Sequence, residues 1–141
     1  MELKTGLVAA ALLLGVASAC GEGTTPPPVP VSPTALRLDL ETPHSDDGAL
    51  VLTLRGPDVS NLQAASPAYL TYTRADSGEG GGAREVRLII VGDLKGGAVA
   101  TASVAPGHHL SDYSVTIDQV AARSDTLRTD LSGYRVSVTV P

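Results

Sequence analysis

The stretch Tyr-Arg-Val-Ser-Val-Thr-Val, residues 134–140, alternates apolar and polar side chains over its whole length. Because successive side chains of a β-strand point to opposite faces, this period of two is typical of a strand with one buried face. Residues 36–41 and 50–55 repeat the pattern with three leucines each. Gly56 and Pro57 then end the second of these stretches. The sequence therefore predicts half-buried strands at three separate places.

Further strands are expected between these three. Residues 69–74, 99–104 and 113–118 are β-rich or alternate in the same way. Residues 86–91 are apolar on both faces except at Arg87, which is typical of a central strand covered on two sides. Seven or eight short strands without a strand–helix–strand rhythm predict an all-β fold, an antiparallel β-sandwich.

Composition limits the function classes. The 141 residues fit one domain plus a targeting segment, and the formal net charge of −5 argues against a nucleic-acid partner. Phe and Trp are absent, so the core is expected to consist of Leu, Val, Ile and Ala. The single cysteine, Cys20, excludes an internal disulfide.

The first nineteen residues have the three parts of a secretory signal peptide. A lysine lies at position 4, residues 7–16 are apolar, and residues 17–19 are small. The apolar run is ten residues long, whereas a membrane-spanning helix needs about 20. We therefore expect residues 1–19 to be a signal peptide that is removed after export.

Residues 17–20, Ala-Ser-Ala-Cys, resemble the lipobox of bacterial lipoproteins. The resemblance implies cleavage before Cys20, acylation of that cysteine and anchoring in membrane lipid at the cell envelope. Gly21 in place of Asp implies sorting toward an outer membrane or cell surface. Ala17 stands where the family has an aliphatic residue such as Leu, so ordinary signal peptidase and a soluble secreted product are the alternative.

Residues 20–33 are expected to form a spacer between the anchor and the domain. Five prolines lie in this stretch, and they favour an extended polyproline II path. At about 3.1 Å per residue, the spacer would hold the domain roughly 40 Å from the lipid surface. The sandwich domain is then expected to occupy residues 34–141.

Residues 130–134, Asp-Leu-Ser-Gly-Tyr, resemble the tyrosine corner of immunoglobulin-like sandwiches. In those domains the Tyr hydroxyl closes a loop, and Val136 stands where antibody domains have Cys. The strand pattern is also similar to cohesin-type surface modules of bacteria. These resemblances imply binding rather than catalysis.

Three histidines share loops with aspartates and are candidate metal ligands: His44, His108 and His109, with Asp46, Asp47 and Asp112. Their spacing fits no zinc or calcium motif, so the interpretation is that they are solvated turn residues. The alternative is a metal-dependent hydrolase that uses the three histidines. The sequence predicts no metal site and no cofactor.

No other pattern predicts catalysis. The glycines of residues 76–83 precede a strand rather than a helix, which indicates a hairpin loop and not a phosphate site. A Gly-x-Ser-x-Gly motif is absent, and alternation places Asp39, Glu41 and Asp118 on solvated strand faces. Tyr69 and Tyr72 lie on opposite faces of one predicted strand, so at most one belongs to an exposed aromatic patch.

The sequence therefore predicts a lipid-anchored, non-catalytic binding module whose partner is an envelope protein or glycan. An assembly subunit that uses its C-terminal strand is the alternative. A metal-dependent hydrolase is the third hypothesis.

Overall fold

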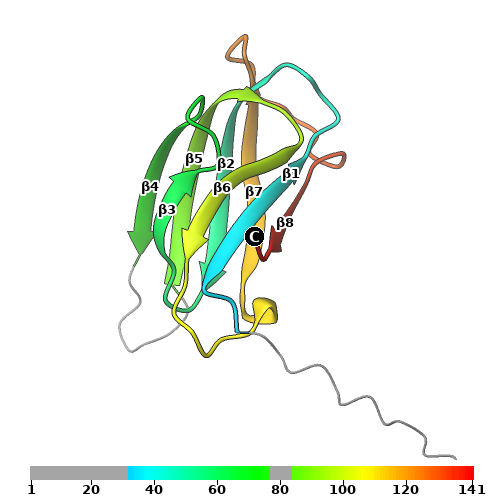
Figure 1. Cartoon of the computed structure of the whole chain (residues 1–141). Helices are drawn as coiled ribbons and strands as arrows, with labels where there is room; N and C mark the ends of the chain where they lie inside the picture. Colours follow the sequence, from blue (N-terminus) through cyan, green and yellow to red (C-terminus); the bar gives the residue numbers. More distant parts are fainter. Residues whose placement is uncertain (1–31, 77–83) are drawn as a thin grey trace, which may run out of the picture.

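The computed structural model describes residues 32–76 and 84–141 (Figure 1). This part of the chain forms eight β-strands and one turn of 3-10 helix, in two four-stranded antiparallel sheets. The predicted all-β antiparallel sandwich is thus confirmed. The signal peptide, Cys20, nearly all of the spacer and the glycine-rich stretch lie outside the described residues.

Each sheet contains strands from both halves of the domain. The first sheet has the order β3-β6-β1-β8, and its strands are β3 (Ser60–Ala64), β6 (Gly97–Ser103), β1 (Ala35–Glu41) and β8 (Arg135–Thr139). The second has the order β4-β5-β2-β7, and its strands are β4 (Leu70–Asp76), β5 (Arg84–Leu94), β2 (Asp47–Gly56) and β7 (Ser114–Ala122). The 3-10 turn, η1 (Leu110–Asp112), precedes β7.

The strand pairs are nested, from the first and last strands of the domain inward to the two middle strands. β1 lies beside β8, β2 beside β7, β3 beside β6 and β4 beside β5, and the β1–β6 and β2–β5 pairs complete the two sheets. Along the chain β1 to β4 alternate between the sheets, unlike the ABED and CFG sheets of an immunoglobulin domain. The likeness to immunoglobulin domains is therefore one of layers, and the connections are different.

The core lies between the sheets and is aliphatic, as the composition predicts. The leucines of β1 and β2 alternate into it, and all six are fully buried. Two tyrosines join them, Tyr113 at 6% exposure and Tyr134 at 7%. Burial of such side chains stabilises the fold by about 1.5 to 3 kcal/mol each.

One strand was not predicted. β3 has a single large apolar side chain, Leu62, and a left-handed residue, Asn61 (φ 46°), so it shows no strong alternating pattern. Among residues 32–76 and 84–141, no helix has the length and hydrophobicity required to span a bilayer.

Candidate functional site

The outer face of the second sheet carries exposed apolar side chains at one end. Leu70 and Tyr72 of β4 are 62% and 61% exposed, and Ile89 and Val91 of β5 are 38% and 37% exposed. These four residues, which we call the apolar face, form two cross-strand pairs, Leu70 with Val91 and Tyr72 with Ile89. Soluble domains expose such apolar side chains singly, whereas a contiguous group marks an interaction surface.

The apolar face corrects the prediction for β5. Because β5 is apolar on both faces, the sequence predicted that other elements cover both of them. In this two-layered fold only the inner face of β5 is covered. Leu88 and Ile90 are fully buried, whereas Ile89 and Val91 point away from the core. A stretch with the composition of a doubly covered strand therefore has only one cover within the described domain.

A shallow hollow of about 300 Å³ adjoins the apolar face. Small residues of β2, β5 and β7 form most of its lining: Gly48, Ala49, Gly92, Ala121 and Ala122. Val91 belongs to both the hollow and the apolar face, and the charged side chains of Arg123 and Asp125 complete the lining. The arrangement is an apolar surface with a recess, and it can accept an apolar side chain of a partner.

Tyr69 lies immediately before β4 and Tyr72 lies within it, and only one of the two belongs to an exposed patch, as predicted. Tyr72 lies on the apolar face, and Tyr69 is half-buried against the core. Beyond the apolar pairs the same outer face becomes polar, since the next cross-strand pair is Arg74 with Arg87.

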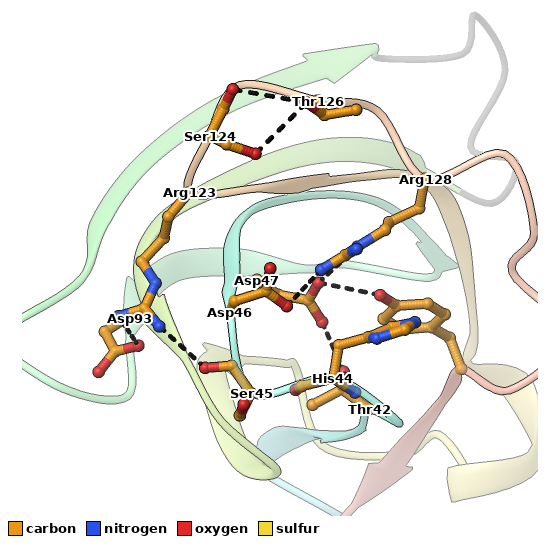
Figure 2. Close-up of polar contacts among 11 residues, drawn as sticks. Thr42, His44, Ser45, Asp46, Asp47, Asp93, Arg123, Ser124, Thr126 and Arg128 are labelled. Atoms are coloured by element: carbon orange, nitrogen blue, oxygen red, sulfur yellow. Dashed lines mark hydrogen bonds and ion pairs between the residues drawn. The ribbon is translucent and has the colours of Figure 1, made fainter.

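A cluster of polar side chains surrounds Asp47, which is fully buried at the start of β2 (Figure 2). Its Oδ1 accepts hydrogen bonds from the Tyr134 hydroxyl at 2.9 Å and from Arg128 Nε at 3.1 Å. Its Oδ2 accepts one from Thr42 Oγ1 at 2.5 Å. The carboxylate thereby joins the loop before β2 to a segment more than 80 residues later in the chain.

Arg128 also binds Asp46, through Nη2 and Oδ1 at 2.5 Å. The Arg128 hydrogen bond lowers the pKa of the Asp46 carboxyl, and burial raises the pKa of Tyr134 together with its hydrogen bond to Asp47. Because three donors already satisfy Asp47, this cluster, hereafter the Asp47 cluster, has the features of a structural network and not of an open ligand site.

The Asp47 cluster corrects two predictions. Asp47 is not a solvated turn residue, because it lies at 0% exposure. Tyr134 does not close its own loop through its hydroxyl, which reaches a carboxylate 87 residues away. The local turn is instead held by backbone nitrogens, from Ser132 to Asp130 Oδ1 and from Tyr134 to the Leu131 carbonyl.

The histidines do not converge. His44 lies beside the Tyr134 ring, with centroids 5.8 Å apart, in the loop that leads into β2. His108 Nε2 lies 3.5 Å from Asp58 Oδ2, in the loop before β7, and His109 donates its backbone N–H to Asp112. Since β2 and β7 are antiparallel, these loops lie at opposite ends of the sandwich (Figure 1). Within residues 32–76 and 84–141, no three His, Cys, Asp or Glu side chains are grouped as a metal site.

The solvated aspartates of the strands are paired. Asp39 accepts hydrogen bonds from Thr139 Oγ1 at 2.7 Å and from Arg37 Nε at 2.9 Å, and these bonds lower its pKa. Asp118 accepts a hydrogen bond from Thr53 Oγ1 at 2.6 Å. Glu41 is exposed, so these three carboxylates share no enclosed site.

A groove of about 710 Å³ lies between the edge strands β7 and β8. Val115, Ile117 and Val136 line it and are only half-buried, and charged side chains at its rim include Glu41 and Arg135. Comparison of the chain with protein-family models, curated proteins and solved structures finds no match. Function has to be argued from these surfaces alone.

Proposed function

We propose that this chain is a lipid-anchored binding module of the bacterial cell envelope, which engages a protein partner through the apolar face. The observation that carries the proposal is the exposure of Ile89 and Val91 on a strand whose sequence is apolar on both sides. A partner that covers the outer face of β5 would complete the burial that this sequence favours.

The chemistry of the apolar face favours a protein surface over a glycan. Three of its four members are aliphatic, and only Tyr72 offers an aromatic ring for stacking on a sugar. The adjoining hollow is lined largely by small residues, and it has the shape and polarity to receive an apolar side chain.

Anchoring rests on the resemblance of residues 17–20 to a lipobox. Two or more acyl chains give a stable anchor, because each buried methylene contributes about 0.8 kcal/mol. Cells that produce the chain should incorporate radioactive fatty acid into it, and Cys20→Ser should abolish both the label and membrane fractionation. Unlabelled wild-type protein, or membrane fractionation that survives Cys20→Ser, would contradict the anchor.

The binding surface is tested with a charge at the centre of the apolar face. Full-length protein carrying Ile89→Asp should lose the envelope proteins that wild type retains after cross-linking in cells. Thr101→Asp is the matched control, because Thr101 lies on an inner strand of the first sheet. Equal retention by both variants would contradict binding through the apolar face.

An assembly subunit is the second candidate function, and the groove between β7 and β8 is the observation that favours it. Both flanking strands are sheet edges, and a partner segment lying in the groove between them would cover Val115, Ile117 and Val136. In that case Val136→Asp should abolish assembly while Ile89→Asp does not.

A further inference from the structure

The sandwich has four edge strands, and three of them carry features that oppose pairing with another chain. β3 is five residues long and is interrupted by a register shift between Ser60 and Gln63. β7 is covered at its C-terminal end, where Leu127 bridges Ala121. β8 is five residues long and begins with an exposed arginine. Short strands, bulges, charges and covering loops are the common protections of sheet edges.

The fourth edge, β4, carries charged residues only at its C-terminal end, Arg74 and Asp76, and lacks the other protections. It runs for seven residues, pairs with β5 without a register shift, and contains neither Pro nor Lys. Its outer side chains Leu70 and Tyr72 are exposed, as are Thr73 and Ala75, which lie opposite the buried side chains of Leu88 and Val86. Within residues 32–76 and 84–141, no strand pairs with the free edge of β4, and its side chains are exposed on much of both faces.

The sequence of β4 is complementary to itself. Residues 70–74 read Leu-Thr-Tyr-Thr-Arg, and the central Thr-Tyr-Thr is the same in both directions. Antiparallel pairing of two copies about Tyr72 places Tyr72 opposite Tyr72 of the partner subunit and Thr71 opposite Thr73 of the partner subunit. Aromatic pairs and Thr pairs are favourable across strands, and in this register no like charges face each other.

We propose that two copies of this chain associate through their β4 strands about a twofold axis at Tyr72, and so form a continuous eight-stranded sheet. This interface is isologous and closed, as most homodimer interfaces are. The row Tyr72, Ile89 and Val51 of one copy continues into the same row of the other. The paired apolar faces then form one larger surface, which adds to the proposed function and does not depend on acylation.

Disulfide trapping in cells tests the pairing. Directly opposed residues of antiparallel strands have Cα atoms about 4.5 to 5.5 Å apart, within the range that a disulfide spans. Full-length Tyr72→Cys should therefore give at least about fivefold more disulfide-linked dimer than Gln119→Cys. Gln119 is the matched control, because it lies in the same cross-strand row at the far edge of the sheet. The Gln119→Cys variant also retains the native Cys20, as Tyr72→Cys does.

Register is tested by Leu70→Cys, which the twofold places opposite Arg74 of the partner subunit. Its cross-linked fraction should fall to the level of Gln119→Cys. A Leu70→Cys yield equal to that of Tyr72→Cys would overturn the proposal, as would equal yields from Tyr72→Cys and Gln119→Cys.

A second variant tests the same interface without introducing a cysteine, which could itself disturb folding. Tyr72→Lys places two like charges at the axis, so sedimentation velocity should show the full chain as a monomer, while Gln119→Lys remains a dimer. Dimers of both variants with the same dissociation constant as wild type would exclude the interface.

Discussion

Each end of the sandwich buries one tyrosine, and the two hydroxyl groups have different surroundings. Tyr134 donates its hydroxyl proton to Asp47 at 2.9 Å, inside the Asp47 cluster. Tyr113, at the other end, is buried to 6% exposure, and its hydroxyl has no hydrogen-bond partner within the described residues. One end is therefore held by polar bonds, whereas packing alone holds the ring at the other end.

The comparison separates two ways of closing a sandwich. In the Asp47 cluster a single buried carboxylate joins the segments around Thr42, Arg128 and Tyr134. At the Tyr113 end, Gly56 packs against the ring so closely that a Cβ there would lie 2.2 Å from Tyr113 Cδ1. The first end should be sensitive to loss of charge and the second to gain of volume.

Asp47→Ala should have the largest effect on stability. Its removal leaves the buried Tyr134 hydroxyl without its acceptor and deprives Arg128 of one of two carboxylates. We expect the free energy of unfolding in urea to fall by about 3 to 4 kcal/mol.

Asp46→Ala is the matched control, because Asp46 binds the same arginine from an exposed position. Exposed ion pairs contribute little to stability because solvent screens them, so its effect should be small. Equal losses from the two variants would show that the cluster acts through Arg128 alone.

Gly56→Ala should have the next largest effect, at the other end. The new methyl group has to displace the buried Tyr113 ring, and overpacking of this kind costs about 1 to 3 kcal/mol. Gly96→Ala is the control, since a Cβ there would lie 3.5 Å from its nearest neighbour, the Leu40 carbonyl oxygen. Urea unfolding of the two variants measures the difference, and a Gly56→Ala variant as stable as wild type would contradict tight packing.

Sequence patterns predicted the strands better than they predicted these ends. Alternation is local, so the leucines of β1 and β2 were placed correctly on the core face. The Asp47 cluster joins residues up to 87 positions apart, and no local pattern connects them. Asp46, Asp47 and Gly48 resemble a turn in the sequence, yet the second aspartate is buried because Arg128 and Tyr134 arrive from the far end of the chain.

The apolar face is a second case in which a local sequence pattern could not predict burial. The pattern of β5 correctly indicated apolar side chains on both faces, but it could not tell whether its own chain would cover both. A two-layered fold covers one face of each sheet, and within the described residues Ile89 and Val91 lie on the uncovered face.

Tyr134→Phe sharpens the comparison, because it removes one oxygen and leaves the ring. Asp47 keeps the hydrogen bonds from Thr42 and Arg128 but loses the third. We expect a loss of about 1 to 2 kcal/mol in urea unfolding. A Tyr134→Phe variant that unfolds at the wild-type midpoint would contradict a structural role for this hydrogen bond.

Tyr113→Phe should have the smallest effect at neutral pH. The hydroxyl that it removes has no partner within the described residues, so the expected change in unfolding free energy is within about 0.5 kcal/mol of zero. At alkaline pH the stability of the variant should differ from that of wild type. Burial raises the pKa of Tyr113 above its ordinary value of 10.0, with Asp112 and Asp58 adding to the shift.

Because the unfolded chain releases this proton at lower pH than the folded one, wild type loses stability as pH rises from 10 through the raised pKa. Tyr113→Phe lacks the group and should lose less stability over that range, while Tyr134, whose pKa is also raised, still titrates in both proteins. Urea midpoints measured from neutral pH to beyond pH 10 would show the curves together at first and then diverging. Curves that stay parallel throughout would mean that the Tyr113 hydroxyl is as well solvated in the folded domain as in the unfolded chain.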